Sequence, residues 1–204
     1  MFRPEAAFCP SPTCYAAHHP ENLTHTFLDC PDSAPVIDWM LATWQHLSGL
    51  VVPRTARVLL ADDPDGWPGW PTNIHVSQLW TRFRVATIGA IWHTRKANPA
   101  VAVHHGSFAR QAATLALTSL TDSIQRDWTR TQVEVQALDD GAFCSDHWRG
   151  FNGKLPMDDF INEWAKHPGI FCKVVGDPPD DSQQDDARSL EMLISPSGPV
   201  PLPA

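Results

Sequence analysis

The sequence predicts a mainly α-helical protein: a small N-terminal knuckle docked on a helix and on an antiparallel helical hairpin, then a short α+β segment and a disordered C-terminal tail. Three features of the 204 residues support this fold class. Residues 1–32 are rich in Cys, Pro and His and lack apolar periodicity, so something other than a core must hold them. Three later stretches repeat apolar residues at helical spacing. Residues 177–204 are acidic and then rich in Pro and Ser, as in disordered chains.

The bulk composition allows a packed core and argues against a membrane protein. Hydrophobic residues make up 43% of the chain and charged residues 19%, which suits a globular fold. No stretch approaches the roughly 20 apolar residues of a membrane span, and residues 1–30 have no apolar signal core. The five cysteines are an odd number, which disfavours a disulfide framework. We therefore expect an intracellular protein, nuclear or cytoplasmic, with no membrane partner.

The first predicted helix covers residues 34–48. Ser33 suits its N-cap, Pro35 suits its first turn, and Gly49 is a suitable stop. Its apolar face carries Ile37, Met40, Leu41, Trp44 and Leu47. The following linker, residues 50–72, contains six Pro and Gly residues. The acidic run 62–66 within it predicts a turn, because it lacks the alternating ligands and the closing Glu of a calcium loop.

Two longer helices are predicted over residues 75–97 and 101–130, and the short break between them favours an antiparallel hairpin. The inward stripe of the first is Leu79, Phe83, Ala86, Ala90 and Ile91, flanked by Trp80 and Trp92. The stripe of the second is Phe108, Ala112, Leu115, Leu120 and Ile124, extended by Trp128. Trp67 and Trp70 in the linker are expected to cover the helix pair rather than to stack nucleic-acid bases.

After residue 130 the pattern changes to short elements. Val133 and Val135 alternate with polar residues as in a strand, residues 157–165 predict an amphipathic helix, and residues 170–175 predict a second strand. The predicted organisation is a knuckle plus helix (1–49), a linker and basic helical hairpin (50–130), a small α+β segment (131–176) and an acidic, Pro-rich disordered tail (177–204).

The residues with the clearest chemistry lie in the knuckle, in the pattern Cys9-x4-Cys14-x10-His25-x4-Cys30. Zinc favours four thiolate or imidazole ligands in a tetrahedron, and these residue types and spacings meet that requirement. All four positions are filled by protein, so we expect a closed structural Zn2+ site with no open position for catalysis. His18 and His19 are close enough to compete with His25, which we prefer because of its shorter spacing to Cys30.

A weaker constellation lies near the C-terminal end of the chain. Cys144-x2-His147 and His167-x4-Cys172 have spacings that suit a second zinc ion. The more ordinary interpretation, which we favour, is a core cysteine with surface histidines around a short helix.

Charge is unevenly distributed along the chain. The net charge of −8 does not suit a nucleic-acid binder, yet residues 78–130 carry seven basic and two acidic residues. The candidate phosphate-binding side chains are Arg82, Arg84, Arg95, Lys96 and Arg110. We expect them on outer faces of the hairpin, where they either meet phosphate or simply remain solvated.

The knuckle and first helix resemble the zinc-binding domain that follows the polymerase in non-LTR retrotransposon reverse transcriptases. The matching residues are Cys9, Cys14, Glu21, Leu23, His25, Phe27-Leu28, Cys30 and Trp39 or Trp44, and Ile91-Trp92-His93-Thr94-Arg95 is similar to an Ile-Trp-x-x-Arg signature further along. The family usually separates the first two cysteines by two residues, whereas four separate Cys9 and Cys14. The resemblance implies a retroelement origin, a reverse transcriptase domain in a larger polyprotein as partner, and association with RNA or DNA.

These features predict a non-catalytic zinc-binding module, similar to the C-terminal part of a retroelement reverse transcriptase, that assists association with template RNA or target DNA. The alternative is a zinc-stabilised structural or protein-interaction module that binds no nucleic acid. A third hypothesis, a metal hydrolase built on Cys144, His147 and His167, would require an open coordination position. We expect no enzyme, because no nucleophile elbow, phosphate-binding Gly loop or polymerase motif is present.

Overall fold

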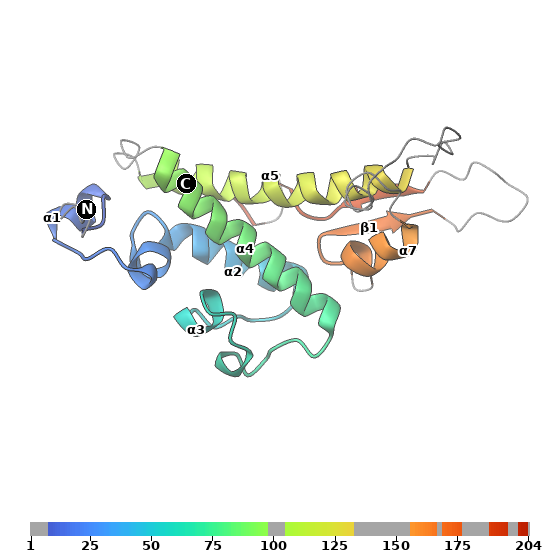
Figure 1. Cartoon of the computed structure of the whole chain (residues 1–204), viewed down its shortest axis with the longest axis horizontal. Coiled ribbons are helices and arrows are strands. Elements are labelled where there is room, and N and C mark those ends of the chain that lie inside the picture. The colour runs from blue at the N-terminus through green and yellow to red at the C-terminus, as the bar shows by residue number, and fades with distance from the viewer. Residues whose placement is uncertain are drawn as a thin grey trace, which may run out of the picture. The chain divides into compact units, whose positions relative to one another are not determined.

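The computed structural model describes residues 8–97, 105–132, 156–166, 169–176, 188–195 and 200–203. They form a mainly helical protein with one small antiparallel sheet, which confirms the predicted fold class (Figure 1). In chain order the elements are α1 (Pro12–Ala16), η2 (His25–Asp29), α2 (Ala34–Ser48), α3 (Ala56–Leu59), η3 (Pro64–Gly66), α4 (Ile74–Ala97), α5 (His105–Gln132), α7 (Met157–Phe160), η5 (Ile161–Ala165), β1 (Cys172–Val175) and β2 (Ser189–Met192). No helix in this part of the chain is both long and apolar enough to cross a bilayer.

The chain divides into two compact units. The first comprises Met1–Leu120 and Ile194–Ala204, and the second comprises Thr121–Leu193. The boundary falls within α5, so this helix contributes to both units. The predicted boundaries at residues 49, 130 and 176 describe a finer division and remain a prediction.

Helix α2 begins and ends where the sequence indicates. Pro35 lies in its first turn, and Gly49 ends it in a left-handed conformation (φ 74°) with its amide donating to the Gln45 carbonyl at 2.9 Å. Ser33 occupies the N-cap position, but its side chain makes no capping hydrogen bond. Instead the backbone amides of Ser33 and Ala34 donate to the carbonyl of Cys30, at 3.0 and 2.8 Å. The start of α2 is therefore tied directly to a predicted metal ligand.

Tryptophan dominates the core between α2 and α4, which pack against each other. Trp44 of α2 and Trp80 of α4 are both fully buried, with ring centroids 5.3 Å apart. Trp67 of the linker packs edge-on against Trp80 at 5.7 Å and is also buried, so it is a core residue, as predicted, and not a base-stacking platform. Trp92, by contrast, is 43% exposed.

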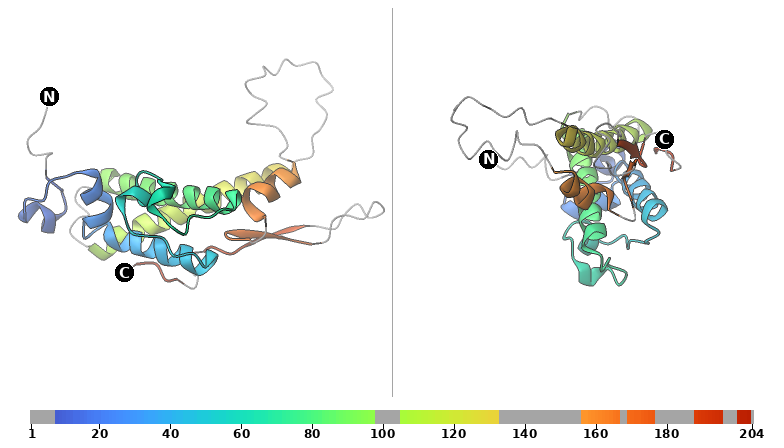
Figure 2. Two further views of the ribbon diagram at one scale, coloured as in Figure 1. Left: turned by 90° about the horizontal axis from the view of Figure 1, so that it is seen from below. Right: turned by 90° about the vertical axis from the view of Figure 1, so that its right-hand side faces the viewer.

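Helix α4 crosses α2, and the first part of α5 runs back in the opposite sense across α4 (Figures 1 and 2). Of the predicted inward residues of α4, Leu79, Phe83, Ala90 and Ile91 are buried. The prediction for Leu115 of α5 was wrong, because its side chain is 41% exposed while Leu117 is buried. Four alanines (Ala109, Ala112, Ala113 and Ala116) share the buried face with Phe108, Leu117, Leu120 and Ile124, and their small side chains weaken its apolar signature.

The second unit contains the predicted α+β segment. Trp128 of α5 packs edge-on against Phe160 of α7 at 5.3 Å, and the Trp164 indole donates to the Asp127 carboxylate at 3.0 Å. The predicted helix over residues 157–165 is present as α7 followed by the π-helical turn η5. The strand predicted over 170–175 is β1, whereas the strand predicted at Val133 and Val135 lies outside the described residues.

One part of the predicted disordered tail is ordered. Residues 189–192 form β2, which pairs antiparallel with β1 in the register Cys172↔Met192 to Val175↔Ser189. The ladder satisfies the backbone groups of both short strands, and the Leu193 amide extends it by donating to the Phe171 carbonyl at 2.8 Å. The prediction of disorder was therefore wrong for this stretch.

Replacing the central indole tests how far the first unit depends on this tryptophan core. Trp80→Ala should lower the free energy of unfolding by about 3–5 kcal/mol, because it leaves a large cavity between α2 and α4. Trp92→Ala on the same helix is the matched control and should cost under about 1 kcal/mol, because that side chain is half exposed. Urea unfolding followed by tryptophan fluorescence and circular dichroism measures both. Equal losses in the two variants would contradict the packing described here.

Candidate metal centre

The first pair of candidate ligands is held by a short loop and a short helix. Cys14 lies in α1, which starts at Pro12, and Cys9 precedes it in an extended segment. The backbone of His19 closes the loop, because its carbonyl accepts from the Cys9 amide at 3.0 Å and its amide donates to the Cys14 carbonyl at 2.9 Å. The neighbouring bridge between Phe8 and Pro20 extends this closure. The four-residue gap therefore accommodates one turn of helix and still returns both thiols to the same side.

The second pair is positioned by the π-helical turn η2. The amide of Cys30 donates to the His25 carbonyl at 2.8 Å, which is the i→i+5 bond of a π helix. Residues five apart diverge on an α-helix, where each residue turns by about 100°, but the wider π turn brings them toward one side. The Asn22 side chain accepts from the His25 amide at 2.9 Å and fixes the start of the turn. The x4 spacing of His25 and Cys30 thus corresponds to a π turn.

The four candidate ligands meet in one place. One side-chain ligand atom from each of Cys9, Cys14, His25 and Cys30 lies within 4.8 Å of every other. The sulfurs of Cys9 and Cys30 are 3.7 Å apart, and all three cysteines are free and buried. Two thiolates bound tetrahedrally at about 2.3 Å from an ion lie about 3.8 Å apart. The cluster therefore has the dimensions and the ligand types of a metal-binding site.

A buried, unpartnered atom supports a ligand role for His25. Its Nε2 is buried and has no hydrogen-bond partner, and the residue as a whole is only 8% exposed. A buried polar nitrogen without a partner is costly, and a metal ion would satisfy it. His19 stacks its ring on that of His25 at a centroid distance of 5.3 Å, and the exposed His18 ring lies edge-on to Phe8. The geometry favours His25 over both alternatives.

Burial sets the protonation of the cluster. Desolvation, followed by the nearby Cys30 and Cys9, raises the pKa of the Cys14 thiol from 9.0 to about 12. Desolvation likewise raises the pKa of Cys30, against the lowering effect of hydrogen bonds from the Asp32 backbone and from Arg95. Desolvation, with His19 and Arg95, lowers the pKa of His25, so its imidazole is neutral and available as a ligand near neutral pH. Three buried thiolates would need a cation beside them.

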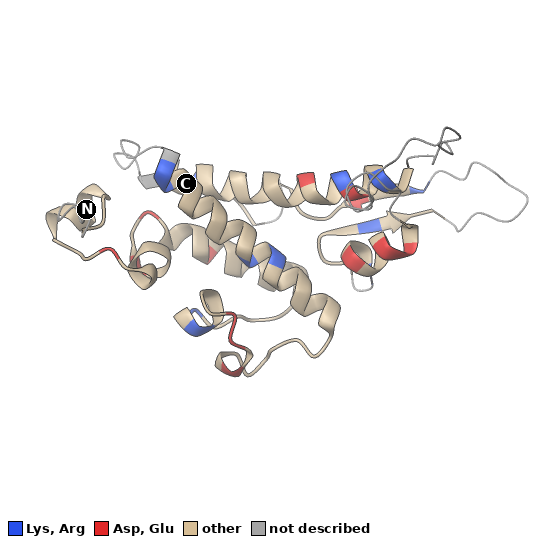
Figure 3. Cartoon of the chain, viewed as in Figure 1, with Lys and Arg blue, Asp and Glu red and all other residues tan. Residues whose placement is uncertain are grey.

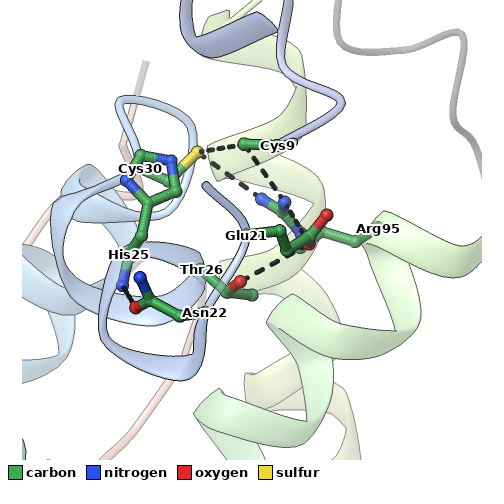
Figure 4. A network of polar contacts seen from close by, with 7 residues as sticks. All are labelled: Cys9, Glu21, Asn22, His25, Thr26, Cys30 and Arg95. Carbon is green, nitrogen blue, oxygen red and sulfur yellow. Dashed lines mark hydrogen bonds and ion pairs between the residues drawn. The ribbon is translucent and has the colours of Figure 1, made fainter. Parts of the chain in front are cut away.

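Arg95 of α4 reaches the cluster from a distant part of the sequence (Figure 4). Its guanidinium donates to the sulfurs of Cys30 and Cys9, at 3.5 and 3.3 Å, and to the Glu21 carboxylate at 2.9 Å. Burial lowers the pKa of Arg95, but the hydrogen bonds to Cys9 and Cys30 outweigh it and raise the pKa overall. Sequence reasoning placed Arg95 on an outer face of the hairpin, and this was wrong. The sequence signal available was its place in the Ile-Trp-x-x-Arg segment.

The structure separates the other predicted basic residues into two groups. Arg84 is buried, bonds to the Leu59 carbonyl at 2.9 Å and pairs with Asp62 at 3.1 Å, so its prediction as an outer-face residue was also wrong. The cause is the irregular α3–η3 segment, whose carbonyl and carboxylate groups need a buried donor. Lys96 and Arg110 are exposed and Arg82 is half-buried. Figure 3 shows the basic residues of α4 in two groups, at mid-helix and at its C-terminal end.

The second candidate metal site is mostly outside the described residues. Cys144, His147 and His167 all lie there. Cys172 is a free, buried cysteine of β1, whose sulfur is 3.6 Å from the Trp164 carbonyl. Desolvation raises the pKa of its thiol to about 12, as expected for a core cysteine.

Comparisons of the chain with protein-family models, with curated proteins and with solved structures gave no match. The interpretation of the site therefore rests on its ligand types, its distances and its surroundings. Those features support metal binding by Cys9, Cys14, His25 and Cys30.

Removing one candidate ligand should distinguish this site from the buried cysteine of β1. Cys30→Ser should abolish stoichiometric metal binding and destabilise residues 8–48, because it removes one of the four candidate ligand atoms that hold this coreless segment together. Cys172→Ala should retain full metal content, because Cys172 lies outside the cluster. Metal analysis of the purified full chains, with hydrogen exchange over residues 8–48, measures both effects. Full metal retention in Cys30→Ser would exclude the site as drawn.

The pH dependence of stability should change sign with metal. Without metal, the folded state keeps the Cys14 proton up to a pKa of about 12 while the unfolded state loses it near 9.0. The folded state then binds more protons, so stability falls as pH rises through this range. With metal bound the ligands are deprotonated, so protons compete and stability falls as pH decreases. Urea midpoints from pH 5 to 11, with chelator and with metal, test this. A rising metal-free midpoint above pH 9 would be the opposite result.

Proposed function

We propose that the chain is a non-catalytic module whose Cys9, Cys14, His25 and Cys30 bind Zn2+ as a structural ion. The observation that carries this proposal is the meeting of three free thiols and one imidazole nitrogen within 4.8 Å. Sulfur-rich tetrahedral sets favour zinc over calcium or magnesium, which prefer oxygen. Four protein ligands fill a tetrahedron, so no position remains for substrate or water. This argues for a structural ion and against hydrolysis at this site.

We also propose that the module belongs to the type found after the polymerase in non-LTR retrotransposon reverse transcriptases. The residues that carry the resemblance in sequence are also neighbours in space: Glu21, the four ligands and Arg95 form a single network. Arg95 is 86 residues from Cys9, so local backbone geometry does not account for the contact between them. A reverse transcriptase domain of a larger polyprotein is the partner that this proposal implies.

Association with RNA or DNA is the second part of the proposal, and the exposed face of α4 supports it. Arg82, Val85, Gly89, Trp92 and Lys96 follow at alternating intervals of three and four residues, which places them along one helix face. Val85 is 56% and Trp92 43% exposed, and the Lys96 ammonium lies 5.2 Å from the centre of the Trp92 ring. Exposed aromatic rings beside cations suit stacking on bases and pairing with phosphates. We name these five residues the α4 face.

A module without nucleic-acid binding is the competing candidate, and one observation favours it. Two of the predicted phosphate-binding residues, Arg84 and Arg95, are occupied within the fold. Of the five predicted phosphate-binding residues, this leaves Arg82, Lys96 and Arg110. The chain as a whole has a net charge of −8. A direct binding measurement therefore distinguishes the two functions.

Salt-dependent binding tests the nucleic-acid part. The full chain should bind single-stranded RNA or DNA at low salt, and Arg82→Gln/Lys96→Gln should weaken binding and reduce the log–log salt slope by about 1.4, because each lost phosphate contact removes about 0.7. The control Arg57→Gln/Lys166→Gln removes one Arg and one Lys from elsewhere, both exposed. Fluorescence anisotropy from 25 to 300 mM salt gives the slopes. No binding by the natural chain at low salt would favour the competing structural module.

A further inference from the structure

The guanidinium of Arg95 occupies an electrostatically unusual position. Its side chain is only 8% exposed, and it bonds to two ligand sulfurs as well as to Glu21. Burying a charge is costly unless strong partners compensate it. A single carboxylate, itself 28% exposed, is a partial partner for a group with five donors. The two sulfurs add two further acceptors.

The strength of those sulfur contacts depends on the metal. A neutral thiol is a weak acceptor, whereas a thiolate accepts a charge-assisted hydrogen bond. Metal binding converts ligand thiols to thiolates. A divalent ion with three thiolates and a neutral imidazole carries a net charge of −1, which the single positive charge of Arg95 balances. Arg95 therefore meets its best partners only when the site holds metal.

Arg95 also lies in the last turn of α4, so its contacts reach beyond the knuckle. Ile91, one turn earlier, is fully buried, and Thr94 beside it is 7% exposed. The same two turns carry Trp92 and Lys96 of the α4 face. The contacts that hold Arg95 therefore also hold the last two turns of α4, where the α4 face ends.

We propose that Arg95 is a positioning residue that couples metal occupancy of the Cys9–Cys14–His25–Cys30 site to the order of the last two turns of α4. This inference rests on the zinc binding proposed above, and it goes beyond it by making the end of α4 depend on metal. Metal loss would release the guanidinium and loosen residues 91–97. Bound metal would thus order the end of α4 as well as the knuckle itself.

Substitutions of Arg84 and of Glu21 serve as controls for Arg95→Met. Arg84 is a second buried arginine on α4, eleven residues or about three turns before Arg95, and it contacts Asp62 and Leu59 rather than the ligands. Arg84→Met therefore controls for the loss of a buried arginine on this helix. Glu21→Gln removes the carboxylate that pairs with Arg95 while leaving both sulfur contacts. If Glu21 alone held Arg95, this change would release α4 even with metal present.

The experiment measures metal binding and α4 order in the full chain. Zn2+ affinity by chelator competition should fall about 10–100-fold in Arg95→Met, as for other groups that support metal ligands. The sulfur-to-metal charge-transfer band of the Co2+ form should shift to lower energy, because the thiolates lose charged donors. Zinc should slow hydrogen exchange over residues 91–97 in the natural chain and in Glu21→Gln, but not in Arg95→Met. Arg84→Met should leave the band in place.

The possible results distinguish a failure of the coupling to α4 from a failure of zinc binding itself. Absence of Zn2+ and Co2+ binding by the natural chain would overturn both. Metal binding with an unshifted band in Arg95→Met, or equal exchange over residues 91–97 with and without zinc in the natural chain, would overturn the coupling alone. Should Arg95→Met not fold, Arg95→Lys keeps the charge but loses the guanidinium fork. It should show partial recovery of affinity with a shifted band, and an unshifted band would again contradict the coupling.

Discussion

The N-terminal part of the structure depends on one constraint: three sulfurs and an imidazole nitrogen share a buried space within 4.8 Å. Like groups of this kind repel one another as thiolates and gain little from one another as thiols, so the arrangement needs a cation to be stable. The supporting contacts radiate from that point. The Cys30 carbonyl receives the first amides of α2, and the Cys9 and Cys30 sulfurs receive the guanidinium of α4. A loop without its own core is thereby joined to two long helices.

Two other arginines of the first unit, one buried and one exposed, perform a similar task. Arg84 joins the α3–η3 segment to α4, and Arg54 pairs with Asp38 of α2 at 2.7 Å while donating to the Leu28 carbonyl at 2.6 Å. In each case an irregular stretch has carbonyl or carboxylate groups that no ladder satisfies, and a guanidinium fork from another element reaches them. Charge along the sequence is therefore a poor guide to charge on the surface of this protein. Of the basic residues of α4, Arg84 and Arg95 bond within the fold.

The sequence was most informative where structure depends on near neighbours. Both ends of α2 follow from Pro35 and Gly49, and the four residues that meet in the candidate metal centre could be identified from residue type and spacing alone. It was least informative where the partner is far along the chain. The role of Arg95 depends on residues 65 to 86 positions away, and β2 exists only because β1 offers it a ladder. Leu115 of α5 was misplaced because the alanines that share the buried face of this helix have little apolar signature.

The π-helical turn η2 constrains the number of residues between His25 and Cys30, because its i→i+5 hydrogen bond joins these two residues. Asp29, the residue of this turn that precedes Cys30, is exposed, so a substitution there would disturb no buried packing. Inserting one residue would instead place the two candidate ligands six residues apart, where an α-helix points them about 120° away from each other. Knuckles built on the same turn should therefore tolerate a substitution at this exposed position more readily than an insertion between the two ligands.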